Sequence, residues 1–274
     1  MSVMGDDEYE VFAVRYAHVD RRSSENFLGG DVPDVAMPMD YFVWVLRGRG
    51  RTVVVDTGFD QALAAKRGRQ LLHPVDEGLA AIGLDHAEVA DIVITHMHYD
   101  HCGNTHLFPN ARFHVQDLEM RYATGRLMRH AAVAAGYEPA DVATMVRRVF
   151  ENRVVFHDEQ ESTLFPGISL HRMGGHTMGL QAVRVNTRRG HVLLISDGAH
   201  FYANFAQRRA FPVLYDLPEL LESYLRAEQL ASSPAHIIPG HDPQVWQRYP
   251  APDDRLNGWV ARLDVEPSDP PRPG

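Results

Sequence analysis

Four side chains of the kinds that bind metal ions lie within six consecutive positions of the segment THMHYDHCGN at 95–104: His96, His98, Asp100 and His101. A single loop histidine is usually solvated or hydrogen-bonded, but so dense a group calls for another explanation. Neutral imidazole nitrogens and carboxylate oxygens are the ligands that zinc and similar divalent ions prefer. The preceding segment, ADIVIT at 90–95, is apolar in the manner of a buried strand, so it would anchor the loop rigidly. The segment therefore predicts metal binding.

The same loop cannot enclose two ions by itself. His96 and His98 are two residues apart and can converge on one ion, whereas Asp100 and His101 are offset and can face a neighbouring point. Further candidates stand at three other expected strand ends, each next to a glycine, in GGHTMG, SDG and PGHD: His176, Asp197 and His241. Five histidines and two aspartates match two adjacent ions with a coordination number of about four to five, with one aspartate shared between them.

The elements that must position these residues are interleaved strands and helices. Alternating or continuously apolar segments predict strands at 9–20, 41–46, 51–56, 90–95, 112–115, 167–173, 181–187, 191–198 and 235–240. Helical patterning is expected at 76–85, 218–230 and, with a break at 136–139, across 116–150. Such interleaving is typical of sheet layers covered by helices, so the fold class is α/β.

One domain is expected to span residues 1–274, because no linker is clear enough to divide the chain and no internal repeat is found. The block at about 116–150 is interpreted as a helical insertion between strands. From Tyr249 the composition changes to proline and charged residues, and we expect a loosely held tail at about 249–274.

Composition bounds the partners and the compartment. The 274 residues carry a formal net charge of -9, and the longest basic runs are arginine pairs, so nucleic acid and anionic membranes are not expected to bind. The single cysteine, Cys102, cannot form an internal disulfide. No apolar run approaches the ~20 residues that span a bilayer, and the first residues lack the pattern of a signal peptide. We expect a cytoplasmic protein without a membrane partner.

These residues resemble the metallo-β-lactamase superfamily. THMHYDH matches its H-x-H-x-D-H signature, the later GGHTMG, SDG and PGHD follow in its order and spacing, and VDTG at 55–58 matches its first motif. The resemblance covers about residues 10–245. It implies a four-layer αββα sandwich of two sheets with a helical insertion, and it places the site at one edge of the sheets.

The resemblance also implies a role for each candidate ligand. One ion would be held by His96, His98 and His176, the second by Asp100, His101 and His241, and both by Asp197. The cofactors would be two divalent ions, with Zn2+ expected and iron, manganese or cobalt also compatible with such ligands. Asp56 is not a ligand in that pattern and is expected to support the histidine loop or to cap its strand. Cys102 is expected to be a small buried residue rather than a thiolate ligand.

Such a pair of ions implies hydrolysis of an acyl or phosphoryl bond. Two ions about 3.5–4 Å apart lower the pKa of a shared water, and one of them can polarise the substrate carbonyl. Asp100 is placed to shuttle the proton of the attacking water. Within the superfamily the layout resembles the N-acyl-homoserine lactonase branch, so the expected reaction is opening of a lactone ring.

One position departs from that branch. Several lactonases carry a tyrosine three residues after the bridging aspartate, where this chain has His200, with Tyr202 two positions further on. Either side chain can donate a hydrogen bond to the substrate carbonyl or to the leaving alkoxide. The alternatives are a supporting or surface role for the histidine and packing for the tyrosine. Four apolar residues at near-helical spacing in the insertion favour core packing over an acyl-chain pocket: Met120, Tyr122, Leu127 and Met128.

Four other functions are alternatives to the lactonase hypothesis. The nearest is hydrolysis of a thioester or carboxylic ester, as in glyoxalase II relatives, which often carry a C-terminal helical domain that the proline-rich tail leaves no room for. A nuclease would need a basic surface, and the di-iron redox branch substitutes a carboxylate in the first loop where His98 stands. A non-catalytic relative would commonly lose ligands, and all seven are present. The expected partner is a small lactone or ester, and the oligomeric state stays open, a homodimer included.

Overall fold

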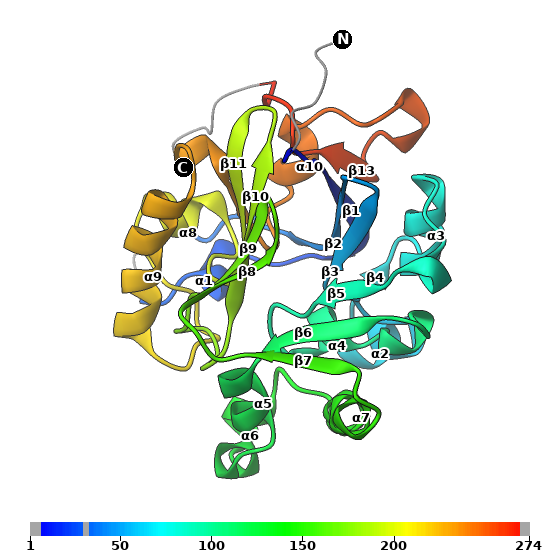
Figure 1. Cartoon of the computed structure of the whole chain (residues 1–274). Helices are drawn as coiled ribbons and strands as arrows, with labels where there is room; N and C mark the ends of the chain where they lie inside the picture. The colour runs from blue at the N-terminus through cyan, green and yellow to red at the C-terminus, as the bar shows by residue number, and fades with distance from the viewer. Residues whose placement is uncertain (1–6, 30–32, 269–274) are drawn as a thin grey trace.

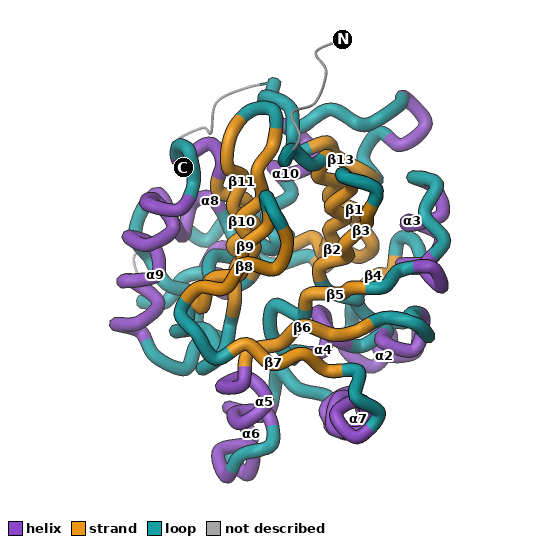
Figure 2. Tube along the Cα trace, viewed as in Figure 1, coloured by secondary structure: helices purple, strands orange, loops and turns teal. Residues whose placement is uncertain are grey.

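The computed structural model describes residues 7–29 and 33–268, and in this part of the chain two β-sheets pack face to face with helices on their outer sides (Figure 1). None of the helices in these two ranges combines the length and apolar character needed to cross a bilayer. The path of the chain between strands, helices and loops can be followed in Figure 2.

The first sheet holds eight strands within the described residues. Their order is β13 (Val260–Arg262), β1 (Glu10–Val19), β2 (Met39–Gly48), β3 (Arg51–Val55), β5 (Asp91–Val93), β6 (Arg112–Gln116) and β7 (Val154–His157), and β4 (Gln70–Leu71) pairs with β1. The pairs from β3 to β7 are parallel, and the others are antiparallel. The parallel strands therefore present their carboxyl ends at a common edge.

The second sheet holds five strands of the described chain. Their order is β12 (Ile237–Pro239), β11 (Gly190–Ser196), β10 (Gln181–Thr187), β9 (Ile168–Arg172) and β8 (Glu161–Phe165). Only the β11–β12 pair in this order is parallel. The side-by-side arrangement brings the ends of β11 and β12 to the same edge.

Helices cover both outer faces. Against the first sheet lie α2 (Gln61–Arg67), α3 (Val75–Ala81), α4 (Tyr99–Cys102), α5 (Asp117–Ala123), α6 (Ala131–Ala134) and α7 (Pro139–Phe150). Against the second lie α8 (Tyr202–Ala206) and α9 (Leu217–Leu230). Two short helices lie in connections, α1 (Ser23–Asn26) and α10 (Gln244–Arg248). Single 3-10 turns stand at His86–Glu88, Thr105–Leu107, Arg126–Arg129, Pro234–His236 and Asp254–Leu256.

Three buried clusters separate the layers. The inter-sheet cluster contains residues such as Trp44 and Val183 from facing strands. A second cluster lies between the first sheet and its helices, and the third joins the second sheet to α9 through residues such as Tyr224. Burial of this apolar surface is the main force that holds the layers together. The predicted αββα sandwich is confirmed.

Local sequence signals account for several boundaries. The turn between β2 and β3 places Arg49 and Gly50 at φ of 55° and 68°, the left-handed conformation that favours tight hairpins. Helix α2 begins where the Asp60 carboxylate accepts a hydrogen bond from the Leu63 amide, and it ends at Gly68 in the left-handed region.

The structure corrects the expected tail. Val260 and its neighbours form β13, which pairs with β1, and Ala261 and Leu263 are fully buried, so residues 249–268 are not loosely held. Apolar residues between the prolines extend the inter-sheet cluster, and composition alone hid them. Residues 269–274 of the expected tail lie outside the described residues.

The insertion was predicted correctly and two neighbouring strands were overlooked. Residues 117–150 contain α5, α6 and α7 between β6 and β7, as expected of a helical block. Strands β7 and β8 follow it directly, and their mostly half-buried sequences gave a weak periodic signal. That a single domain spans the whole chain stays a prediction.

Candidate metal centre

All of the predicted ligands lie at one edge of the two sheets. The histidine loop follows β5, His176 follows β9, Asp197 follows β11 directly, and His241 follows β12. Side chains that are up to 145 positions apart in the sequence therefore meet because the ends of four strands meet. The structure brings all seven predicted ligands together in overlapping groups.

The first group consists of three imidazoles. The Nε2 atom of His176 lies 3.2 Å from Nε2 of His96 and 3.0 Å from Nδ1 of His98. The other nitrogen of His176, Nδ1, is 2.7 Å from the carbonyl oxygen of Val213 and donates its proton there. The Nε2 atom is then an unprotonated acceptor that faces two further ring nitrogens, as in a ligand set.

The second group combines two imidazoles and a carboxylate. The Oδ2 atom of Asp100 lies 3.5 Å from Nε2 of His101 and 3.7 Å from Nε2 of His241. The Nδ1 atom of His241 is 2.9 Å from the carbonyl oxygen of Asp40, and this contact orients the ring. The Nε2 atoms of both histidines consequently point toward the carboxylate.

Asp197 lies between the two groups and gives one carboxylate oxygen to each. Its Oδ1 atom is 3.2 Å from Nε2 of His101 and 3.0 Å from Nε2 of His241. Its Oδ2 atom is 3.4 Å from Nε2 of His176 and 4.0 Å from Nε2 of His96. This orientation is the one required of a carboxylate that bridges two ions.

The donor set fits divalent cations. The buried atoms Asp197 Oδ1 and His101 Nε2 lie 3.2 Å apart, yet neither forms a well-aligned hydrogen bond with any of the described residues, although a buried polar atom is normally paired. The three nitrogens of the first group would repel one another through their lone pairs without a shared cation or proton. Nitrogen and carboxylate oxygen atoms at such spacing are the donors that zinc and related ions take.

Burial keeps the first group in the ligating form. Desolvation lowers the pKa of His96 and His98 well below the usual value, and it lowers the pKa of His176 to about 4. All three rings are therefore neutral at pH 7, and neutral imidazole is the form that binds metals.

Nearby carboxylates raise the pKa values of the two imidazoles in the second group. Burial lowers the pKa of His101, but the charges of Asp197, Asp100 and Asp56 outweigh it and hold that pKa well above the usual value. His241 is raised in pKa by the same competition between burial and Asp197. Protons on these two rings balance the carboxylates when no cation is bound, so metal loading must release protons.

Comparison with known families decides the classification. A model of the metallo-beta-lactamase superfamily matches residues 37–245, well over half of the chain. The chain belongs to the metallo-beta-lactamase superfamily. The match encloses every residue of the two ligand groups, from the histidine loop to His241.

Curated relatives of this superfamily member are lactonases by name. The chain is 29% identical over 210 residues to N-acyl homoserine lactonase AiiB of Agrobacterium fabrum, which covers 70% of this chain and 75% of the relative. It is 26% identical over 241 residues to N-acyl homoserine lactonase AttM of Azorhizobium caulinodans, which covers 80% and 88%. The protein is thus a metal-dependent hydrolase of the metallo-beta-lactamase superfamily.

Solved structures support the fold. A quorum-quenching N-acyl homoserine lactone lactonase superposes with a TM-score of 0.71 at 19% identity, over 88% of this chain and 94% of that one. An N-acyl homoserine lactone hydrolase with the product N-hexanoyl-L-homoserine at its catalytic metal center gives a TM-score of 0.70 at 19% identity, over 85% and 93%. At this identity the likeness bears on the fold alone, and it agrees with the four-layer sandwich.

Asp56 supports the histidine loop through hydrogen bonds to residues that adjoin or belong to it. Its carboxylate accepts hydrogen bonds from His101 Nδ1 at 2.7 Å, from the Thr95 amide at 2.7 Å and from the Thr95 hydroxyl at 2.8 Å. Asp56 and Ser196 both have positive φ, 63° and 50°, which is uncommon for residues other than glycine. The predicted support by Asp56 is confirmed, and the backbone is bent sharply at the ends of β3 and β11 to provide it.

Glu119 of α5 is a second support, and the sequence did not single it out. Its fully buried carboxylate accepts hydrogen bonds from the Met97 amide at 2.9 Å, the Tyr137 hydroxyl at 3.0 Å, the Thr177 hydroxyl at 2.6 Å and the Gly179 amide at 3.2 Å. Met97 lies between two candidate ligands and Thr177 follows a third. The sequence holds no signal for this role, because Asp117 and Arg121 in the same helix are charged as well.

His200 and Tyr202 lie in different environments. The Nε2 atom of His200 is 3.0 Å from Oδ2 of Asp197, and its ring stacks on Phe211 at 3.5 Å between centroids. The ring of Tyr202 belongs to the inter-sheet cluster and lies beneath the guanidinium of Arg248, which favours the packing alternative over contact with the substrate. The two residues are two positions apart in the sequence, and of the two only the histidine lines the cavity described below.

A cavity of about 540 Å3 opens over the two groups. Candidate ligands line it together with His200, the insertion residues Tyr122 and Val133, and the loop residues Leu214 and Tyr215. Of the four insertion residues at near-helical spacing, Met120 is in the core, and Leu127 and Met128 pack against it. Core packing is therefore the main role of that group, and Tyr122 alone among the four also reaches the cavity.

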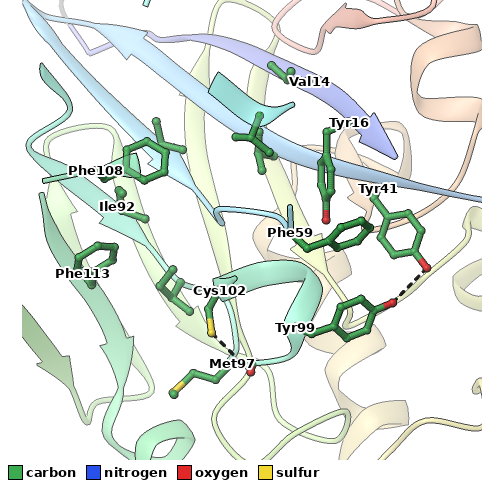
Figure 3. Packing of buried hydrophobic residues seen from close by; sticks show 14 of the residues in the cluster. Val14, Tyr16, Tyr41, Phe59, Ile92, Met97, Tyr99, Cys102, Phe108 and Phe113 are labelled. Atoms are coloured by element: carbon green, nitrogen blue, oxygen red, sulfur yellow. Dashed lines mark hydrogen bonds between the residues drawn. The ribbon is translucent and has the colours of Figure 1, made fainter. Parts of the chain in front are cut away.

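Cys102 does not take part in either group. It is fully buried in the cluster beneath α4, and Figure 3 shows its thiol directed at the carbonyl oxygen of Met97, at 3.6 Å. Burial raises the pKa of the thiol well above its usual value, which keeps it protonated. The prediction of a small buried residue at this position is confirmed.

Proposed function

We propose that the protein is a dinuclear-metal hydrolase that opens lactone rings, with N-acyl-homoserine lactones as the expected substrate class. One observation carries the proposal: Asp197 gives its two oxygens to two separate groups of candidate ligands. A carboxylate committed in this way suits a pair of ions, and the relatives named above carry lactonase names.

In this proposal each group holds one divalent ion. The first ion is held by His96, His98 and His176, the second by Asp100, His101 and His241, and both by Asp197. When bound, such a pair supplies a nucleophile from water at neutral pH and an electrophile for the substrate carbonyl. Zinc is the expected metal because the ligands are neutral imidazoles and carboxylates.

Asp100 is the proton acceptor of the proposed reaction. It lines the cavity, and its Oδ2 atom faces His101 and His241 rather than a hydrogen-bond donor of the core. Burial raises its pKa, but these two histidines outweigh burial and lower it. The carboxylate is therefore ionised at neutral pH and can accept the proton of the attacking water before passing it to the leaving alkoxide.

His200 acts as a positioning residue in this proposal. Burial lowers its pKa to about 4, so at neutral pH it is an uncharged ring. With a proton on Nε2, it donates to Oδ2 of Asp197 and fixes the torsion of the bridging carboxylate. Phe211 holds the imidazole plane by stacking. The histidine thus takes a supporting place where several lactonases have a tyrosine.

The cavity wall suits an acyl group. Val133 of the insertion and Leu214 and Tyr215 of the loop before α9 line one cavity with the candidate ligands. Tyr122 and Tyr215 pack edge to face at 5.2 Å between centroids and join the insertion to that loop. An acyl chain placed there would be removed from water while the ring to be opened lies near Asp100.

Two measurements test the proposal. Elemental analysis of protein purified without added metal is expected to give about two divalent ions per chain. Acid release is then followed with a panel of lactones, aryl esters, thioesters and a β-lactam, and lactones are expected to be the best substrates. Turnover confined to thioesters would replace the proposal with its alternative, a glyoxalase II-like esterase. Full activity of a metal-free preparation would refute the metal mechanism altogether.

A further inference from the structure

The cavity above the metal centre has a cationic wall that the proposed function leaves unexplained. Three arginines line it together with the candidate ligands: Arg21, Arg67 and Arg69. A neutral acyl lactone needs no positive charge for its recognition. The charges on this wall therefore point to a feature of the substrate beyond its lactone ring.

The three arginines differ in how their charge is balanced. Arg67 forms an ion pair with Glu138 at 2.5 Å. Arg21 faces the half-exposed carboxylate of Glu25 at 3.8 Å and donates to that residue's carbonyl oxygen. Within the described residues, no carboxylate lies within 4.0 Å of the Arg69 guanidinium. Arg69 is thus the cavity arginine whose charge is left for a ligand.

Arg69 is held in place by neutral acceptors. Its Nε donates to the Tyr99 hydroxyl at 3.1 Å, and its Nη1 donates to the carbonyl oxygen of Arg67 at 3.0 Å. Its backbone amide donates to the carbonyl oxygen of Ala64, which fixes the chain just after α2. A half-buried guanidinium oriented in this way is prepared to bind a carboxylate through its remaining N–H groups.

Two tyrosines complete the environment of this guanidinium. The hydroxyls of Tyr41 and Tyr99 lie 3.4 Å apart and face each other in Figure 3. The Tyr99 ring stacks on Phe59, and the Arg67 guanidinium lies 4.3 Å from its centroid, so its position is fixed. Tyr41 packs edge to face on His241 at 5.1 Å, which joins this region to the second ligand group.

We propose that Arg69, with the hydroxyls of Tyr41 and Tyr99, forms a subsite for a carboxylate on the substrate. The proposal rests on the proposed lactone hydrolysis and narrows it to lactones that carry an acidic group at a distance from the ring. Asp100 is the acidic residue of the cavity that acts on Arg69, but it is engaged by His101 and His241. The guanidinium therefore remains available.

The decisive experiment compares two lactones that differ only at the end of the acyl chain, one with a carboxylate and one with its methyl ester. With the metal-loaded protein, kcat/KM is expected to be about 10- to 100-fold higher for the carboxylate, the range given by hydrogen bonds to a charged group. Arg69→Gln keeps a donor for Tyr99 but removes the charge, so this preference is expected to fall to about one through a higher KM for the acidic lactone.

Matched variants separate recognition from support of the fold. Arg69→Lys keeps the charge and is expected to restore part of the preference for the acidic lactone. Arg147 is an exposed residue of α7 outside the cavity, and Arg147→Gln is expected to leave kcat/KM unchanged for both lactones. Equal kcat/KM for the two lactones in the wild-type protein would overturn the proposal. An equal loss of kcat/KM for both lactones in Arg69→Gln would also overturn the proposal.

A binding measurement keeps the inference testable if no lactone is hydrolysed. Calorimetric titration of the metal-loaded protein with adipate and with hexanoate compares a dicarboxylate with a monocarboxylate of the same length. Adipate is expected to bind about tenfold more tightly or better, and Arg69→Gln is expected to remove the difference. Equal affinities in the wild-type protein would refute the carboxylate subsite, whatever the reaction proves to be.

Discussion

Replacement of Glu119 tests how the ligand loops are held together. Each of its two carboxylate oxygens accepts two hydrogen bonds, and the donors come from the histidine loop, the insertion and the loop that carries His176. Glu119→Gln keeps one acceptor oxygen, but its amide group would face two donors. The substitution therefore breaks two bonds to an acceptor that is charged in the native protein.

The expected loss of stability in Glu119→Gln follows from those contacts. Two hydrogen bonds to a charged group contribute about 3–6 kcal/mol together, and part of this is offset because the variant no longer buries a charge. We expect the free energy of unfolding to fall by about 2–4 kcal/mol. Since Met97 and Thr177 each adjoin a ligand of the first group, we also expect affinity for one ion to fall by roughly 10- to 100-fold.

Chemical denaturation and competition with a chromophoric chelator measure the two effects separately. Glu77→Gln, an exposed position on α3, serves as the control and is expected to change neither quantity. Wild-type stability together with wild-type metal retention in Glu119→Gln would refute the reasoning. A loss of stability with metal affinity intact would show that Glu119 supports the fold but does not position the ligands.

Three other outcomes are expected. Removal of the ions by a chelator should lower the melting temperature, because the ligand groups then face one another without a cation, and an unchanged melting temperature would contradict the assigned ligands. His200→Ala should lower turnover by roughly 10- to 100-fold with metal content unchanged. His200→Gln should recover part of that turnover. Undiminished turnover in the alanine variant would show that the residue has only a structural role. His171 is fully buried outside the metal centre, and desolvation lowers its pKa from 6.5 to about 4. Its folded pKa lies below the unfolded one, so stability present above pH 6.5 is lost as the pH falls toward 4, by about 3 kcal/mol. Between pH 6.5 and 4, the free energy of unfolding of His171→Gln should depend less on pH than that of the wild-type protein. Parallel curves for the two proteins would exclude His171 as the origin of the pH dependence.

The sequence predicted the ligands well because each stands where a strand ends. Apolar strands such as 90–95 and 191–198 are recognised by composition, and the polar residues that follow them must share an edge once the strands pair. The structure accordingly brings together all seven predicted ligands. Their assignment to two ions stays a prediction.

The sequence was less informative about residues that act through tertiary contacts. Glu119 and Arg69 have no characteristic spacing from the ligands, since their positions depend on how the insertion and α2 pack. The sequence could not distinguish packing from substrate contact for Tyr202, because closeness in sequence to Asp197 does not determine which way a helical residue points. The segment 249–268 was misjudged because a three-residue strand such as β13 gains its stability from its partner β1.

The contact between Gly136 and His98 limits how this scaffold can diversify. A β-carbon at position 136 would lie 2.4 Å from Nε2 of His98, and the Gly136 carbonyl oxygen accepts a hydrogen bond from the Tyr99 amide. Grafting a foreign insertion between β6 and β7 would therefore succeed only where a glycine is retained at this point. The acyl wall is better changed at Val133, which lines the cavity, than at Leu127 or Met128, which pack against the core.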